Sequence, residues 1–224
     1  MVGEGGVMNG RWDGFVPPEC QSSSNILRFD AQQRWVVAHE PLHVDIDVNK
    51  TCGVGPGMAF VNRLISFGNF SKSDVVGLVP CAIGGTKIIQ WGKGSNLYNQ
   101  LVTRAKAAVQ GGGRIRGVLW YQGESDTTNI QDANAYRGRM ETLVANLRSD
   151  LGEPSLLIIQ VALTSGEGMY VETVREAQLG IQLPNVKCVD AKGLQLNPDN
   201  LHLTTMAQVH LGLMLALSFL DTSG

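Results

Sequence analysis

The chain has 224 residues, of which 43% are hydrophobic and 17% are charged, and its formal net charge at pH 7 is −2. These values are typical of a globular protein and exclude the low hydrophobicity and high net charge of a disordered chain. A chain of this length suits one compact domain, expected over residues 1–224. Lysine and arginine residues occur singly, so no basic stripe predicts nucleic acid as the main partner.

The apolar segment VHLGLMLALSFL near the C-terminus is too short to span a bilayer and predicts a buried helix, so we expect a soluble protein with no membrane partner. Residues 1–14 have no basic region followed by an apolar one and predict no signal peptide. The compartment stays open, with a cytoplasmic protein as the default expectation.

The four cysteines form no C-x-x-C pair, which gives a zinc or redox site of that kind little support. Cys81 and Cys188 lie in apolar, strand-like segments and are interpreted as small core residues. For Cys20 and Cys52 a disulfide is an open alternative, because the sequence cannot show whether they approach each other.

The first 56 residues lack a sustained hydrophobic period, and only HVDIDV at residues 43–48 alternates as a strand does. This region is predicted to form long loops over a sheet edge. Within it, HEPLH at residues 39–43 matches the zinc-protease pattern H-E-x-x-H, which requires both histidines one turn apart on a helix. Pro41 disfavours a helical conformation at Glu40. A zinc hydrolase is therefore the weaker alternative, and a loop that enters an exposed strand is preferred.

Strand and helix patterns alternate over the rest of the chain. Apolar segments typical of buried strands occupy residues 75–80, 117–122, 156–163 and 186–191. Amphipathic or apolar helical patterns occupy residues 96–110, 132–151, 171–182 and 204–220. The alternation predicts βαβ units, and therefore a mostly parallel sheet with helices on both faces. The carboxyl ends of the strands then share one edge, where ligands bind.

Glycines and polar side chains follow two of these strands, at the predicted ligand edge. In CAIGGT, Gly84 and Gly85 allow backbone N–H groups to approach a ligand. In WYQGESD, the Gln122 amide is positioned to donate to a developing oxyanion, and Glu124 and Asp126 lie beside it. For each segment, an ordinary loop with local hydrogen bonds is the alternative.

DNLHLT places Asp199 three residues before His202, between the last predicted strand and the last helix. In such a pattern the aspartate can accept the Nδ1 proton of the imidazole and leave Nε2 free to act as a base. The alternative is a surface aspartate that caps the helix at Thr204. The position before the last helix favours the catalytic interpretation.

Five motifs in chain order carry a resemblance: PCAIGGTKIIQWGKGS, GVLWYQGESD, VREAQLG, CVDAKGL and DNLHLT. Together they resemble the plant carbohydrate esterases of the SGNH-hydrolase superfamily, in the sialate O-acetylesterase-like group known as carbohydrate esterase family six. The resemblance covers essentially the whole chain. It implies a flavodoxin-like three-layer α/β/α sandwich with a mostly parallel sheet. It also implies an enzyme that removes acetyl groups from carbohydrates through a Ser–His–Asp triad, without metal or cofactor.

The resemblance also implies roles for single residues. Asp199 and His202 match the acid and the base, and Gly84 or Gly85 matches the backbone oxyanion donor. Gln122 corresponds to the side-chain oxyanion donor, and Glu124 to a supporting residue in the same block.

The nucleophile is expected upstream of residue 1. Family members begin with an apolar strand that runs into G-Q-S-N-M-A-G-R-G-G, whose serine is the nucleophile, and this chain begins MVGEGG, which resembles that motif from its methionine onward. Valine replaces the alanine, and glutamate replaces the arginine. Ser95, Ser125 and Ser165 are poor substitutes, because none follows a strand in a turn that would aim its oxygen at His202.

In a sheet of order 2-1-3-4-5 the first strand is internal, so its absence would leave two exposed strand edges. The 224-residue chain is therefore expected to be inactive or nearly so. A carbohydrate-binding protein without catalysis is the rival from another class. The acetylated sugar, the position of its acetyl group and the oligomeric state cannot be inferred from the sequence.

Overall fold

The computed structural model of the protein describes residues 2–67, 70–71 and 74–221. It divides into two compact units. The first comprises the described residues of Met1–Gly84 and Leu194–Gly224, and the second comprises Gly85–Gly193. Each unit has a three-stranded sheet of its own that contains parallel strand pairs. The protein is thus an α/β protein with parallel sheet, whereas the three-layer sandwich and the single domain stay predictions.

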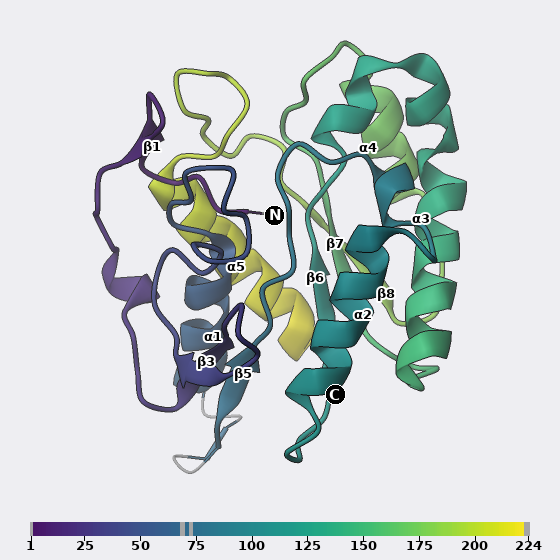
Figure 1. The fold of residues 1–224 in the computed structure, drawn as a ribbon. Coiled ribbons are helices and arrows are strands. Elements are labelled where there is room, and N and C mark those ends of the chain that lie inside the picture. Colours follow the sequence, from purple (N-terminus) through teal and green to yellow (C-terminus); the bar gives the residue numbers. More distant parts are fainter. Residues whose placement is uncertain (1, 68–69, 72–73, 222–224) are drawn as a thin grey trace. The chain divides into compact units, whose positions relative to one another are not determined.

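The sheet of the first unit has the order β4-β3-β5 (Figure 1). Strand β3 (Ile26–Phe29) pairs antiparallel with β4 (Trp35–Val37) and parallel with β5 (Val76–Leu78). Within the described residues, β5 pairs with β3 only. The unit also contains the hairpin of β1 (Val7–Met8) and β2 (Arg11–Trp12), the short 3-10 helix η1 (Pro18–Cys20), and the helices α1 (Pro56–Ser66) and α5 (Thr205–Leu220).

Helices α1 and α5 pack tightly against each other, because a glycine lies at their contact. A Cβ atom at Gly212 would lie 2.5 Å from the carbonyl oxygen of Pro56 and 2.7 Å from the Cβ of Ala59. Nearby, the rings of Phe60 and Phe219 meet edge to face with their centroids 5.7 Å apart, a favoured aromatic arrangement. The α1–α5 contact therefore depends on the missing side chain at position 212.

The second unit has a fully parallel sheet of order β6-β7-β8, formed by β6 (Val118–Trp120), β7 (Ile158–Ala162) and β8 (Val186–Asp190). Every residue of the central strand β7 is buried. Helix α3 (Ile130–Leu151) contacts both α2 (Asn96–Ala108) and α4 (Val171–Leu179). Two 3-10 helices complete the unit, η2 (Ile88–Trp91) and η3 (Glu124–Thr128).

The regular elements predicted from residue 75 onward are confirmed. The four apolar segments correspond to β5 to β8 and the four helical patterns to α2 to α5, with small shifts at their ends. Capping residues fix some of these ends. The Asn129 side chain accepts the N–H groups of Gln131 and Asp132 at the start of α3, and Gly152 ends α3 with a left-handed conformation at φ 70°.

The prediction of a strand at residues 43–48 is wrong, since this segment forms turns. The carbonyl of His43 accepts the N–H groups three and four residues later. The two aspartates that create the alternation face separate partners. Asp45 pairs with Arg28 at 2.6 Å, and Asp47 accepts the N–H of Gly84 at 2.8 Å. Alternation thus arose here from inward-facing acids, not from a pleated strand.

The expectation of loops throughout the first 56 residues is also wrong, because β3 and β4 form a hairpin there and α1 begins at Pro56. Cys81 and Cys188, interpreted as core residues, are only half-buried. Cys20 and Cys52, for which a disulfide was left open, are buried free thiols.

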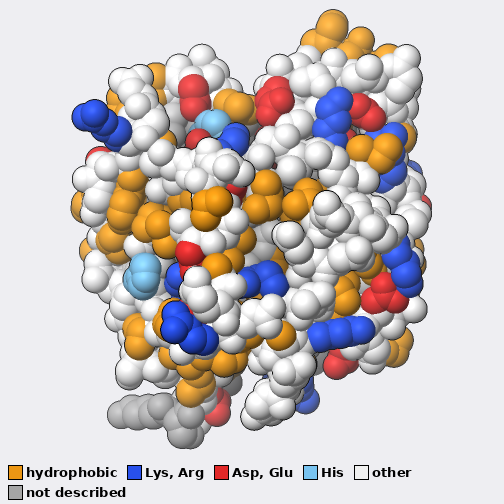
Figure 2. Space-filling model, in the orientation of Figure 1, with side chains coloured by type: hydrophobic (Ala, Val, Ile, Leu, Met, Phe, Trp, Pro, Cys, Tyr) orange, Lys and Arg blue, Asp and Glu red, His pale blue; other side chains and the backbone are white. Residues whose placement is uncertain are grey.

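Charged side chains of both signs are scattered over the face of the molecule in Figure 2. Among the ion pairs of the second unit, Nζ of Lys93 lies 2.7 Å from Oδ1 of Asp150. Exposed ion pairs of this kind contribute about 1 kcal/mol or less each, so we attribute most of the stability to apolar burial. No helix among the described residues is long and apolar enough to cross a membrane.

A buried carboxyl, Glu40, connects two irregular segments of the first unit. It is 7% exposed, and its oxygens accept the N–H of Leu42 at 3.0 Å and of Gly55 at 3.3 Å. Burial raises its pKa to about 8, although both hydrogen bonds act in the opposite direction. Glu40 thereby fastens residues 40–42 to the turn that precedes α1.

Replacement of Gly212 by alanine is expected to lower the free energy of unfolding by about 1–3 kcal/mol, because the added methyl group collides with the backbone of α1. The matched control is Gly138→Ala in α3, where a Cβ meets no atom within 4 Å. That change should raise the free energy of unfolding by about 0.5–1 kcal/mol through helix propensity. Urea denaturation measures both, and equal effects would contradict the close α1–α5 contact.

Glu40→Gln is expected to change how stability depends on pH. The pKa of Glu40 rises on folding from 4.5 to about 8, so the folded protein holds a proton that the unfolded chain releases. The wild-type free energy of unfolding therefore falls between about pH 5 and 8, by at most about 5 kcal/mol from this group. The variant lacks this contribution. Urea denaturation at both pH values should show the variant gaining relative to wild type, and parallel curves would contradict the buried proton.

Candidate active site

The segment before α5 in the first unit is a tight loop closed by its own backbone. Leu196 and Leu203 form an antiparallel bridge, and the N–H of Asn197 donates to the carbonyl of His202 at 2.7 Å. The Thr204 side chain then caps α5 by accepting the N–H of Ala207. The capping role that the sequence left open for Asp199 is therefore filled by Thr204.

Asp199 organises this loop with both carboxylate oxygens. Oδ1 accepts the backbone N–H groups of Leu201 at 2.9 Å and of His202 at 3.0 Å. Oδ2 lies 2.7 Å from Nδ1 of His202, so the predicted contact between the two side chains is present. Partial burial alone would raise the pKa of Asp199, but the hydrogen bonds from His202 and Leu201 together lower it. The geometry allows the Asp199 carboxylate to accept a proton from Nδ1 of His202.

The other ring nitrogen of His202 faces a residue that sequence reasoning missed. Oε1 of Glu4 lies 3.3 Å from Nε2, and the Glu4 side chain is only 16% exposed. The adjacent Gly5 is fixed by two backbone hydrogen bonds to Val54, at 3.0 and 2.9 Å. The replacement of arginine by glutamate in the opening motif was visible, but nothing in the sequence indicated its partner. No serine among the described residues hydrogen-bonds to His202.

The two glycines after β5 differ in what their N–H groups do. The N–H of Gly84 donates to Oδ2 of Asp47 at 2.8 Å, and Asp47 is buried. This donor is therefore occupied within the first unit. Gly85, where the second unit begins, adopts the left-handed conformation at φ 70° that a glycine accommodates without strain. Of the two predicted oxyanion donors, Gly85 is the one that the described residues leave open.

Gln122 is buried in the second unit with its carboxamide fully engaged. Nε2 donates to the carbonyl of Thr86 at 2.9 Å and to Oδ2 of Asp126 at 2.6 Å. Oε1 accepts the hydroxyl of Tyr136 at 3.2 Å. The amide is therefore held at the carboxyl end of β6, as predicted, and it binds the turn that follows Gly85. To donate to an oxyanion it must exchange one of these acceptors.

Glu124 begins η3, and its backbone carbonyl accepts the N–H of Glu167 at 3.1 Å. Next to it, the Ser125 hydroxyl donates to Oε1 of Glu167 at 2.7 Å. These bonds join the segments after β6 and β7, which share the carboxyl edge of this sheet. Ser95 has a structural part, since it caps α2 by accepting the N–H of Tyr98. Within the second unit, Ser95 and Ser125 thus serve local structure.

The HEPLH segment does not meet the requirement of a zinc-protease motif, because residues 39–43 are not helical. Its glutamate is the buried Glu40 that fastens the turn before α1, and Nδ1 of His39 lies 3.1 Å from the carbonyl of Glu40. In the part of the chain that the structure describes, no group of three or more histidine, cysteine or acidic side chains could hold a metal ion.

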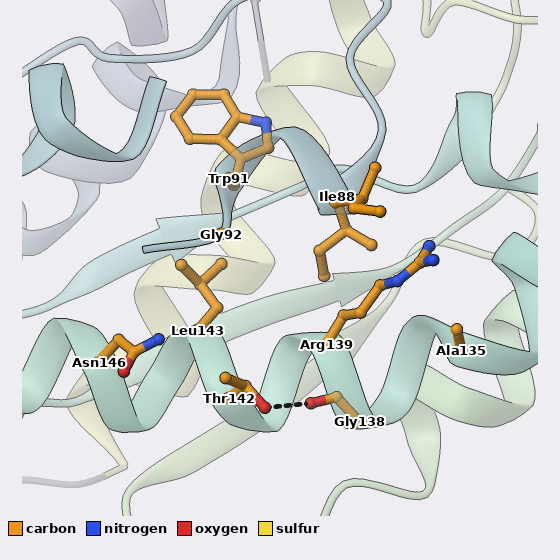
Figure 3. A pocket seen from close by; sticks show the side chains of 10 residues that line it. Ile88, Trp91, Gly92, Ala135, Gly138, Arg139, Thr142, Leu143 and Asn146 are labelled. Atoms are coloured by element: carbon orange, nitrogen blue, oxygen red, sulfur yellow. Dashed lines mark hydrogen bonds between the residues drawn. The ribbon is translucent and has the colours of Figure 1, made fainter. Parts of the chain in front are cut away.

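A shallow hollow of about 340 Å³ lies between η2 and α3 of the second unit (Figure 3). Ile88 and Trp91 of η2 approach it from one side, and Leu143 and Arg139 of α3 from the other. The lining is mainly apolar. None of the side chains predicted to act in catalysis contributes to this lining.

Comparison with known proteins places these residues in a family. Residues 1–221 match the family model described as carbohydrate esterase, sialic acid-specific acetylesterase. A probable carbohydrate esterase of Arabidopsis thaliana is 57% identical over 227 residues, which cover 99% of this chain and 86% of that protein.

Two solved structures are also similar. The X-ray structure of an Arabidopsis thaliana protein matches with a TM-score of 0.96 at 57% identity and covers 99% of this chain and 93% of its own. A carbohydrate acetylesterase from Xanthomonas citri shares the fold alone, with a TM-score of 0.58 at 21% identity over 89% of this chain and 49% of its own. The chain thus belongs to the carbohydrate esterase family of sialic acid-specific acetylesterases.

Proposed function

We propose that this fold hydrolyses acetyl esters of carbohydrates by a serine mechanism in which Asp199 and His202 are the acid and the base. The observation that carries the proposal is the hydrogen bond of 2.7 Å between Oδ2 of Asp199 and Nδ1 of His202. It fixes the tautomer whose Nε2 can take a proton from a nucleophile. The family and the name of the relative, a probable carbohydrate esterase, supply the substrate class.

The nucleophile in this proposal is a serine in a strand that precedes Met1 and ends in G-Q-S-N. Its hydroxyl would replace Oε1 of Glu4 at Nε2 of His202 and transfer its proton there as it attacks the acetyl carbonyl. The acetyl group moves to the serine, and the sugar leaves as the alcohol with the proton from His202. Water then attacks the acetyl-serine, with His202 again as the base, and acetate is released.

The tetrahedral intermediates need hydrogen-bond donors for their oxyanion. The proposed donors are the N–H of the serine, the N–H of Gly85 and the Gln122 amide. Gly85 is preferred over Gly84, whose N–H is bound to Asp47. Gln122 would exchange the Thr86 carbonyl for the oxyanion and keep its bond to Asp126. Glu124 supports this group through its backbone bond to Glu167. No step requires a metal or a cofactor.

Two forms of the protein test the function: the 224-residue chain, and the same chain extended by an apolar strand ending in G-Q-S-N. Acetate release from a panel of acetylated sugars is the measurement. We expect release by the extended form and none above background by the 224-residue chain, in which this proposal assigns no nucleophile. Robust turnover by the 224-residue chain would show that the serine lies within it. A folded extended form without turnover on any acetyl ester would contradict the esterase proposal.

Variants of the extended form test the roles of the pair. Asp199→Asn should lower kcat by about 10³–10⁴-fold, because the amide favours the wrong tautomer of His202. His202→Ala should be as damaging, since it removes the base. Asp13→Asn, an acid of the β1–β2 hairpin, is the matched control and should leave kcat unchanged. Equal rates for Asp199→Asn and the control would contradict the assigned role.

A carbohydrate-binding function without catalysis is the second candidate, favoured by the fact that, among the described residues, His202 hydrogen-bonds to no serine. It predicts that both forms bind an acetylated sugar and that neither hydrolyses it. Calorimetric titration with the same sugars, beside the acetate assay, separates this candidate from the esterase.

A further inference from the structure

Asp126, which the proposed mechanism uses only as a partner of Gln122, is a completely buried acid in η3 of the second unit, with 0% exposure. A single oxygen of its carboxyl, Oδ2, makes all of its hydrogen bonds. It accepts the backbone N–H of Ile88 at 2.9 Å and the Gln122 amide at 2.6 Å. Asp126 thereby connects the segment after Gly85 to the carboxyl end of β6.

The segment held in this way is the turn of residues 85–88, which contains the proposed backbone donor. Gln122 binds the turn a second time, through the carbonyl of Thr86. The Ile88 side chain is 2% exposed and packs beside α3 (Figure 3). The indole N–H of Trp91 donates to the Thr86 hydroxyl at 3.0 Å. Asp126 and the buried Ile88 side chain thus secure the far end of the turn, and Gln122, which Asp126 holds, secures the backbone next to Gly85.

The second oxygen of Asp126, Oδ1, has no hydrogen-bond partner within the described residues. Burial raises the pKa of Asp126, in spite of the hydrogen bonds from Gln122 and Ile88. The positive charge of Arg139 also acts to lower this pKa, but Arg139 is itself paired with Asp132 at 2.8 Å.

We propose that Asp126 is a positioning residue of the acetylesterase site, and this inference rests on the proposed function. Through Oδ2 it fixes the Gly85–Ile88 turn and the Gln122 carboxamide relative to each other, so that the backbone and side-chain donors point at one oxyanion. Asp126 touches neither substrate nor nucleophile. Its effect lies in the transition state, where a displaced donor is costly, and not in binding of the ester.

Two substitutions in the extended, active form separate positioning from simple structural support. Asp126→Ala removes the acceptor and should lower kcat by about 100-fold, with KM changed less than about twofold. Asp126→Asn keeps an acceptor oxygen at the Oδ2 site and places its amide at the unpartnered Oδ1 site, so it should retain most of kcat. Asp150→Asn, which loses an ion pair to Lys93 but no contact to residues 85–88 or to Gln122, is the matched control and should leave both constants unchanged.

A second measurement uses the 224-residue chain and does not depend on catalysis. Asp126→Ala should accelerate hydrogen exchange of the Ile88 amide and shift the side-chain amide signals of Gln122 in NMR spectra, while the amides of β7 exchange as in wild type. Asp126→Asn should change both much less.

The outcomes distinguish the two proposals. If the extended wild type has no turnover, the proposed function fails, and the exchange data alone decide whether Asp126 holds the turn. If Asp126→Ala keeps wild-type kcat, or leaves Ile88 exchange unchanged, the positioning role is overturned. It is also overturned if alanine and asparagine variants lose kcat equally, or if the loss appears in KM with kcat retained.

Discussion

The chemistry of this site depends on one carboxylate that does two different jobs. Asp199 uses Oδ1 to hold the backbone of its own loop and Oδ2 to hold the imidazole of His202. The same interaction therefore shapes the loop and orients the base. Since Thr204 caps α5, Asp199 does not have to divide its oxygens between helix and histidine. Within a short D-x-x-H segment, one carboxylate in this way both shapes the loop and orients the imidazole from the Nδ1 side.

Three other buried carboxyls, those of Glu40, Asp47 and Asp126, follow a related principle, because each holds irregular backbone. Glu40 accepts N–H groups on either side of a turn, Asp47 accepts that of Gly84, and Asp126 accepts that of Ile88. Irregular segments cannot satisfy their N–H groups through a sheet or helix, and a carboxyl oxygen is a strong substitute. Acids near a suspected site in this family can therefore be structural, which is why HEPLH resembled a metal motif.

The part of the fold that the sequence predicted well is the part in which each element carries its own signal. Buried runs such as the one that forms β7 and stripes such as the one that forms α3 need no distant partner to be recognised. Helix α1 was not predicted, because Gly55, Pro56 and Gly57 are residue types that usually interrupt a helix. Pro56 instead takes the first helical position, and a Cβ at Gly57 would lie 2.6 Å from Leu42. The close approach of Gly57 to Leu42 is a tertiary contact, and no local sequence pattern indicates it.

The candidate site shows the same difference between features with a local sequence signal and features that depend on long-range contacts. Asp199 and His202 were recognisable because their contact is local, whereas the contact of Glu4 with His202 joins residues at opposite ends of the chain. The commitment of the Gly84 N–H to Asp47 was equally invisible, since Asp47 was assigned to a strand that does not exist. Residue types indicated the chemistry, and long-range contacts decided which atoms are free to perform it.

The close approach of α1 and α5 at Gly212 has a consequence for how the position of the base changes during evolution. His202 lies just before α5, so the position of the imidazole depends on where that helix begins. We therefore expect a larger side chain at position 212, far along the helix from His202, to shift α5 against α1 and with it the loop that carries the base. Relatives that differ at this helix contact are then expected to differ in activity even where every residue of the site is the same.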